Sequence, residues 1–173
     1  NLDALGEQPA VGNTIVLPVN PAAIGAGTFD YFVEVSDIAT TVESSSATMI
    51  IANRISITQD IVDDEVDRNM DYDLLVAAQG GFGELSYQWM KEDEESMVMI
   101  PLVNAGNISG VTTSTLSFTP FTGDDTGVYQ VMITDEGNSR GEIDSKLSSK
   151  AKLTATAGVP IASTFGLALL AAM

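Results

Sequence analysis

The 173-residue chain contains neither cysteine nor histidine, and it has only 7 Lys and Arg residues against 24 Asp and Glu. Without cysteine there is no disulfide, no zinc-thiolate site and no thiolate nucleophile. Without histidine there is no imidazole general base, no Ser-His-Asp triad and no His-ligated metal. The function classes that remain are a binding module, a structural module, or an enzyme built from carboxylates alone.

The charge balance bears on partners and location. The formal net charge is −17 and the sequence pI is near 4.1, so the chain repels phosphate backbones and we expect no nucleic-acid partner. A cysteine-free acidic composition is typical of exported proteins, and we expect an extracellular or cell-surface location, in a prokaryote. No basic and apolar signal peptide follows Asn1, so we expect a processed chain or the tail of a longer one.

Apolar residues make up 45% of the chain, which is enough for a packed core. Polar and apolar residues alternate with period two in several short segments, and long helical periodicity does not occur. Turn-forming Gly, Asn, Asp and Ser residues separate these segments. The pattern predicts an all-β antiparallel sandwich. The predicted strands include Ser86–Met90, Thr115–Thr119, Tyr129–Thr134 and Lys150–Thr156.

The sequence also contains an internal repeat, in which three segments recur in the same order. The pairs are Asn13–Leu17 with Ser114–Phe118, Tyr31–Asp37 with Tyr129–Asp135, and, less closely, Ser44–Ile50 with Leu147–Leu153. We therefore predict that residues 1–53 are the C-terminal half of a unit that residues 54–157 contain whole. Residues 158–173 form a separate apolar C-terminal segment.

Four motifs in residues 54–157 resemble those of a bacterial immunoglobulin-like (Ig-like) domain of the I-set kind. They are Ala78-Gln79-Gly80, Leu85–Trp89, Ile108–Leu116 and Asp125–Val131. The resemblance implies an antiparallel Ig-like β-sandwich preceded by a partial second Ig-like unit. In this family a tryptophan fills the core beside an inter-sheet disulfide, and an Asp-x-Gly-x-Tyr segment forms a tyrosine corner. Trp89 and Tyr129 match those places, whereas Val76 and Val131 stand where the cysteines would be.

This resemblance assigns most conspicuous side chains to the core. The residues expected to be buried are Val76, Trp89, Leu116, Phe118, Tyr129, Val131 and Leu153. The aromatic residues then left for ligand binding are Tyr72, Phe82, Tyr87, Phe121 and Phe165, which are scattered along the chain. Asn107-Ile108-Ser109 matches a glycosylation sequon, whose use we do not expect in a bacterial protein.

The C-terminal run from Val159 to Met173 carries no charge. At 15 residues it is shorter than the roughly 20 that a membrane-spanning helix needs. Val159-Pro160, Ser163 and Gly166-Leu167 resemble the start of the IPTL/PEP-type C-terminal sorting signals of exported proteins, but the basic cluster that ends such signals is missing. The alternatives are a sorting signal, a membrane segment, or a strand donated to another subunit. A membrane is expected as a partner only through this segment.

Acidic residues cluster between Asp60 and Asp73, just after the predicted boundary between the two units. Clustered carboxylates supply the oxygen ligands that calcium needs, so Asp60, Asp63, Asp64 and Asp67 are candidate calcium ligands. The alternative is a solvated acidic face that keeps the protein soluble. We expect no other cofactor. A glycosidase needs two carboxylates about 5–10 Å apart across a cleft. Nothing in the sequence predicts such a pair, so we expect no enzyme.

The leading hypothesis is a non-catalytic structural or adhesive module of an extracellular or cell-surface protein. Its expected partners are copies of itself or neighbouring surface proteins. In an extended form of this hypothesis the chain assembles into a filament by strand exchange, with residues 159–173 as the donated segment. The alternative is a carbohydrate- or protein-binding accessory domain of an exported enzyme, which requires exposed aromatic residues in a row.

Overall fold

The computed structural model describes residues 20–157, and the chain forms two compact units, residues 1–52 and 53–173. The predicted strand around Thr14–Leu17 and the C-terminal segment 158–173 lie outside the described residues. Between residues 20 and 157, no helix is long and apolar enough to cross a membrane.

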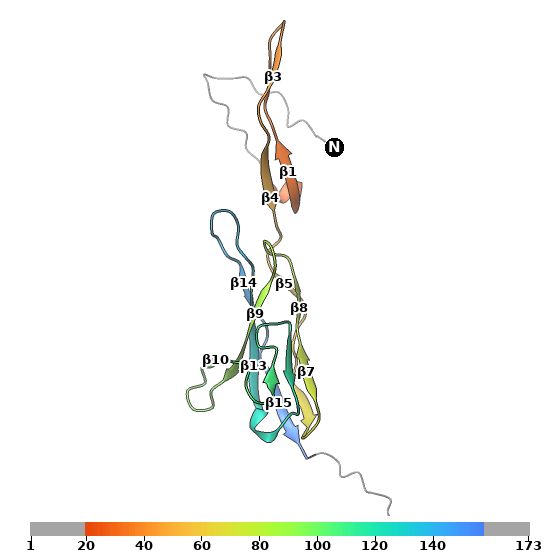
Figure 1. Ribbon diagram of the computed structural model, residues 1–173, viewed down its shortest axis with the longest axis vertical. Helices are drawn as coiled ribbons and strands as arrows, with labels where there is room; N and C mark the ends of the chain where they lie inside the picture. Colours follow the sequence, from red (N-terminus) through yellow and green to blue (C-terminus); the bar gives the residue numbers. More distant parts are fainter. Residues whose placement is uncertain (1–19, 158–173) are drawn as a thin grey trace, which may run out of the picture. The chain divides into compact units, whose positions relative to one another are not determined.

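The described part of the first unit is a short helix followed by a β-hairpin (Figure 1). Helix α1 (Pro21–Ile24) leads into strand β1 (Gly27–Tyr31), which pairs antiparallel with β4 (Ala47–Ile51). The hairpin continues through β2 (Glu34–Ser36) and β3 (Thr41–Glu43), which pair with each other. We call residues 27–51 the first hairpin.

The described part of the second unit is made almost entirely of strands. They are β5 (Ser56–Gln59), β6 (Asp64–Asp67), β7 (Tyr72–Leu75), β8 (Ala77–Gln79), β9 (Ser86–Glu92), β10 (Met99–Pro101), β11 (Ile108–Ser109), β12 (Thr115–Phe118), β13 (Gly127–Thr134), β14 (Ser145–Leu147) and β15 (Ala151–Thr156), with the short 3₁₀ helix η1 (Gly123–Asp125) before β13. Alternation explains these strands: in β13 the residues Tyr129, Val131 and Ile133 are buried, and their neighbours are not.

These strands form two layers. One sheet has the order β10-β9-β13-β15-β6, with β14 also paired to β13, and the other has the order β11-β12-β7. The first strands of the unit join both layers, because β5 pairs with β8, which directly continues β7, and β6 pairs with β15. This arrangement is an Ig-like β-sandwich, so the predicted fold class is confirmed. One detail differs from a purely antiparallel sandwich, since β6 and β15 run parallel.

The core lies between the two layers and contains every side chain predicted to be there. Trp89 is fully buried, and its indole Nε1 donates a hydrogen bond of 2.8 Å to the Thr113 carbonyl. The two valines at the cysteine places of the family are also buried, so apolar packing fills the space of a disulfide. The predicted core residues, all buried, are Val76, Trp89, Leu116, Phe118, Tyr129, Val131 and Leu153.

Phe121, one of the aromatic residues left as candidates for ligand binding, is not available for that role. Its ring is fully buried and packs edge-on against Phe118, with ring centroids 5.1 Å apart. The reason lies in the backbone: the Phe121 N–H donates to the Met70 carbonyl, and the Phe121 carbonyl accepts from the Asn69 N–H. These two bonds turn the loop inward and add an aromatic ring to the core.

Candidate interaction surfaces

The loop before β13 is held by Asp125. Its buried carboxylate oxygen Oδ2 accepts hydrogen bonds from the Thr122 N–H (2.7 Å), the Thr122 hydroxyl (2.6 Å) and Asn107 Nδ2 (2.7 Å). The Tyr129 hydroxyl donates to the Asp125 carbonyl, and burial raises the pKa of this phenol. Tyr129 therefore makes the corner hydrogen bond that the family resemblance implies, and Asp125 supports the loop.

Asn107, the first residue of the sequon, belongs to the same network. Besides its bond to Asp125, its Nδ2 donates to the Pro120 carbonyl at 2.8 Å. An amide nitrogen has two protons to donate, so both are used within the folded unit. The side chain therefore connects the loop before β13 to the end of β12.

The four candidate calcium ligands lie on or just before β6, beside β15. Asp60 accepts from the Ser149 hydroxyl (2.8 Å), and Asp63 accepts from the Lys152 N–H (2.7 Å). Asp67 accepts from the Thr156 hydroxyl (2.7 Å), and Asp64 accepts from the Tyr72 hydroxyl (3.0 Å). The bonds of Asp60, Asp63 and Asp67 attach the first strands of the unit to β15 and the segment just before it, whereas the bond of Asp64 joins β6 to β7. They give the acidic cluster a structural use that the sequence pattern did not indicate.

The same carboxylates are spread along the strand and do not converge. Within residues 20–157, no three or more acidic side chains are grouped so that they hold a metal ion. The calcium site stays a prediction. Burial raises the pKa of the nearby Tyr72 hydroxyl to about 12, and the Asp64 carboxylate contributes to this rise.

A second acidic network, which sequence reasoning missed, joins the loops at one end of the sandwich. Asp135 Oδ2 accepts from the Phe82 N–H (2.8 Å), and its Oδ1 accepts from the N–H groups of Gly137 (3.0 Å) and Asp144 (2.9 Å). The Phe82 N–H is the main cause that lowers the pKa of the Asp135 carboxyl, and burial opposes it. Asp144 in turn accepts from the Ile55 N–H at 2.8 Å. The only signal in the sequence was an Asp at the end of a predicted strand.

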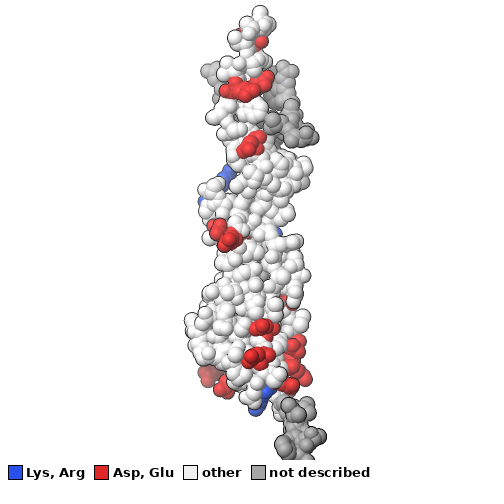
Figure 2. Space-filling view, turned by 45° about the vertical axis from the view of Figure 1, so that its right-hand side comes forward, with Lys and Arg blue, Asp and Glu red and all other residues white. Residues whose placement is uncertain are grey.

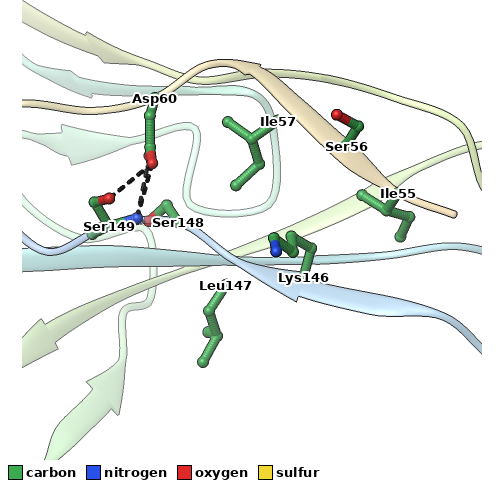
Figure 3. A pocket seen from close by; sticks show the side chains of 8 residues that line it. All are labelled: Ile55, Ser56, Ile57, Asp60, Lys146, Leu147, Ser148 and Ser149. Atoms are coloured by element: carbon green, nitrogen blue, oxygen red, sulfur yellow. Dashed lines mark hydrogen bonds between the residues drawn. The ribbon is translucent and has the colours of Figure 1, made fainter.

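A shallow groove of about 470 Å³ lies between β5 and β14 (Figure 3). The side chains that line it include Ile57 of β5, Ile55 just before β5, and Lys146 of β14. The bonds from Ser149 to Asp60 close one end. Among the described strands, β14 pairs only with β13, so its other edge is open beside this groove. Pockets that bind small molecules bury most of their ligand, and this open groove does not enclose one.

The surface of the described residues is rich in acidic side chains. Figure 2 shows Asp and Glu at several places on one face, with few Lys or Arg among them. One ion pair joins Lys150 to Glu92, and another joins Arg54 to Asp144 at 3.5 Å. A surface of this kind attracts basic groups electrostatically.

The chain has likenesses to solved structures. It is similar to titin domain M7 (20% identity, TM-score 0.46, covering 62% of this chain and 98% of that one). It is also similar to the N-terminal four Ig domains of Dscam1 isoform 1.9 (24%, TM-score 0.49, 68% of this chain) and to Duf (Kirre) D1 (19%, TM-score 0.44, 61% and 99%). The chain spans 30% of that Dscam1 structure.

No protein-family model matches the sequence, and no curated protein sequence is similar to it. The likenesses to solved structures concern the fold alone. Three features identify the second unit as an Ig-like β-sandwich. Strand β5 pairs with β8 whereas β6 pairs with β15, Trp89 is buried in the core, and the Tyr129 hydroxyl makes the corner hydrogen bond.

Proposed function

We propose that the protein is a non-catalytic structural or adhesive module of an extracellular or cell-surface protein, and that it acts through protein contacts made by its Ig-like surface. One observation carries the proposal. Conspicuous side chains of the sequence, such as Trp89, Asp125 and Asp60, are engaged in holding strands and loops together. The strand edges and the acidic surface are then the parts left for recognition.

A direct test couples the full chain to microscopic beads and measures bead clustering against beads that carry an unrelated acidic protein. Clustering of the coated beads with each other, or binding to proteins of a cell surface, supports the proposal. A panel of glycosides provides the opposing arm. Turnover that disappears when a pair of carboxylates is replaced would overturn a non-catalytic function.

Assembly into a filament is the finer form of this proposal. The predicted donor, residues 159–173, lies outside the described residues, and a head-to-tail contact of this kind does not close into a ring. Negative-stain microscopy and sizing of the full chain, beside a version that ends at Ala157, test it. Filaments that disappear on truncation support strand donation, and monomers in both samples contradict it.

The accessory-domain alternative has less support. It requires exposed aromatic residues in a row, but Phe121 is in the core and the Tyr72 ring packs against it at a centroid distance of 6.0 Å. We therefore retain a single proposed function.

A further inference from the structure

The first hairpin has the same pairing register as the last hairpin of the sandwich, formed by β13, β14 and β15. Tyr31 lies opposite Ala47 as Tyr129 lies opposite Ala151. Further along, Val35 lies opposite Val42 as Ile133 lies opposite Lys146. The spacing between these pairs is identical on both strands of the two hairpins.

Both hairpins are interrupted at the same place, and a serine makes the same hydrogen bonds there. The Ser44 N–H donates to the Val33 carbonyl (2.8 Å), and the Ser44 hydroxyl oxygen accepts from the Val33 N–H (2.9 Å). The Ser148 N–H donates to the Val131 carbonyl (3.0 Å), and its hydroxyl oxygen accepts from the Val131 N–H (3.0 Å). Each serine hydroxyl also donates to the next carbonyl. The irregularity is therefore one structural device used twice.

The tips of the hairpins are closed by corresponding aspartates. Asp37 Oδ1 accepts from the N–H groups of Ala39 and Thr40, both at 2.7 Å. Asp135 Oδ1 accepts from the N–H groups of Gly137 and Asp144. In both turns the first donor is the N–H two residues beyond the aspartate, in Ala39 or Gly137. The second donor is the N–H of Thr40 or Asp144, and the carbonyl of that same residue accepts the aspartate's own N–H.

The two hairpins differ in what covers their apolar faces. In the sandwich, Val131 and Ile133 are 0% exposed, because Trp89, Leu116 and Phe118 complete the same core. In the first hairpin the corresponding Val33 and Val35 are 56% and 65% exposed. Among the described strands, β1 pairs only with β4 and β2 only with β3, so the edge that β9 occupies on β13 is open on the first hairpin. An isolated two-stranded hairpin is at best marginally stable in water.

The side chains of this face match those that the sandwich buries. At corresponding positions Tyr31 replaces Tyr129, Val33 replaces Val131, Val35 replaces Ile133, Ala47 replaces Ala151 and Met49 replaces Leu153. Volume-conserving apolar substitutions of this kind are the ones that packed cores tolerate best. A surface that accommodates the face of β13 to β15 is therefore chemically suited to the face of the first hairpin.

We propose that the apolar face of the first hairpin is a docking surface for the N-terminal half of an Ig-like sandwich, of the kind that residues 54–113 form in the second unit. The chain's own match to β12, Asn13–Leu17, lies outside the described residues. The docked half places an extended strand along the open edge of β1 and β2, as β9 lies along β13. It covers Val33 and Val35 with an aromatic and aliphatic layer, of the kind to which Trp89 and Val76 contribute in the second unit. This inference goes beyond the proposed function, which needs no particular partner.

The test fuses an extra copy of residues 54–113 ahead of Asn1 of the full chain and measures hydrogen–deuterium exchange of the hairpin. Residues 1–12 then link the copy to the predicted strand at Asn13–Leu17, and loop closure costs little more for a link of this length. We expect amides in residues 31–36 and 47–51 to exchange roughly ten-fold or more slowly than in the unfused chain. If they exchange at the same rate in both proteins, the proposal is overturned.

Two variants of the fused chain show whether the apolar face is responsible. Val33→Asp puts a charge into the proposed interface and is expected to abolish the protection. Phe32→Asp makes a similar change at the neighbouring position, which corresponds to Gln130 on the outer side of β13, and is expected to keep it. Because both side chains are exposed in the hairpin, the exchange of the unfused variants shows that the hairpin itself is intact. Equal loss in both variants contradicts the proposal.

Other occupants of the face give different results with the unfused chain. Hairpin protection that rises with protein concentration, together with a doubled mass in sedimentation, assigns the face to a second copy of the whole chain. Protection that is lost in a version ending at Ala157 assigns it to the C-terminal segment. Either result overturns the proposed half-sandwich partner. Neither decides whether the protein is an adhesive module, because bead clustering tests that separately.

Discussion

The first hairpin and the hairpin of β13, β14 and β15 share their register, their serine irregularity and their aspartate turn, but one exposes the apolar face that the other buries. The shared features depend on local contacts, which a short segment determines by itself. Burial depends on strands that are distant in sequence. The comparison therefore separates what the hairpin sequence specifies from what the rest of an Ig-like unit must supply, and the following changes test that separation.

The largest effect is expected from removing the ring that covers the buried hairpin. Trp89→Ala leaves a cavity above Val131 and should lower the free energy of unfolding of the second unit by about 3–5 kcal/mol. Urea unfolding measures the change. Val103→Ala, at a side chain that is 73% exposed, is the control and should unfold like the parent. A Trp89→Ala protein as stable as the parent would remove the basis for the Ig-like core.

The next effect concerns the corner that precedes β13. Asp125→Ala leaves the Thr122 and Asn107 donors without their acceptor, which should cost about 2–3 kcal/mol because the site is partly buried. Asp124→Ala changes the exposed neighbouring carboxylate and should have little effect. The first hairpin lacks such a carboxylate, because Gly27 stands at the corresponding place, four residues before Tyr31. Equal stability of the two variants, measured by urea unfolding, would mean that the Asp125 network is not a stabilising one.

The sharpest comparison uses the two serines. Ser148→Ala removes the acceptor of the Val131 N–H inside the sandwich and should destabilise it by about 1–2 kcal/mol. Ser44→Ala removes the same bond in the exposed first hairpin, where water replaces it, and should change stability by less than about 0.5 kcal/mol. Thermal unfolding of both variants measures the difference. Equal losses would show that burial does not set the value of this bond.

Acid should weaken the sandwich partly through Asp135. The native pKa of this carboxyl is lowered, chiefly by the Phe82 N–H, whereas in the unfolded chain it is near 3.9. The stabilisation is therefore present above the unfolded pKa and is lost as the pH falls through the native pKa. We expect Asp135→Asn to be less stable than the parent at pH 7, with the two approaching each other towards pH 2. A difference that stays constant with pH in thermal unfolding would contradict this account.

The smallest expected effect concerns calcium. If Asp60, Asp63, Asp64 and Asp67 bind calcium weakly, a concentration equal to the Kd stabilises the fold by about 0.4 kcal/mol, which raises the Tm by roughly 2–3 °C. The prediction requires that the rise is absent in Asp64→Asn and is not reproduced by magnesium. An unchanged Tm at millimolar calcium leaves the hydrogen bonds of these aspartates to Ser149, Lys152, Thr156 and Tyr72 as the explanation of the cluster.

The sandwich and its core were predictable because alternation and the Trp89 and Tyr129 motifs are local patterns with a fixed meaning in this fold. Strand β6 was not, because its residues Asp64–Asp67 are mostly acidic and exposed, and its parallel partner β15 is far away in sequence. The place of Phe121 in the core was missed for a similar reason. Its burial depends on backbone bonds to Asn69 and Met70, which no pattern around residue 121 reveals.

The hydrogen bonds of Asn107 have a consequence for the timing of any modification. A glycan is attached to the side-chain nitrogen of asparagine, and in the folded unit that nitrogen is occupied by the Pro120 carbonyl and the Asp125 carboxylate. Transfer would thus require a chain that has not yet closed the loop around Asp125. A glycosylated amide keeps a single N–H, so a sugar added at that stage would leave at most one of these two hydrogen bonds. Folding and glycosylation at this sequon are therefore competing fates of the same nitrogen atom.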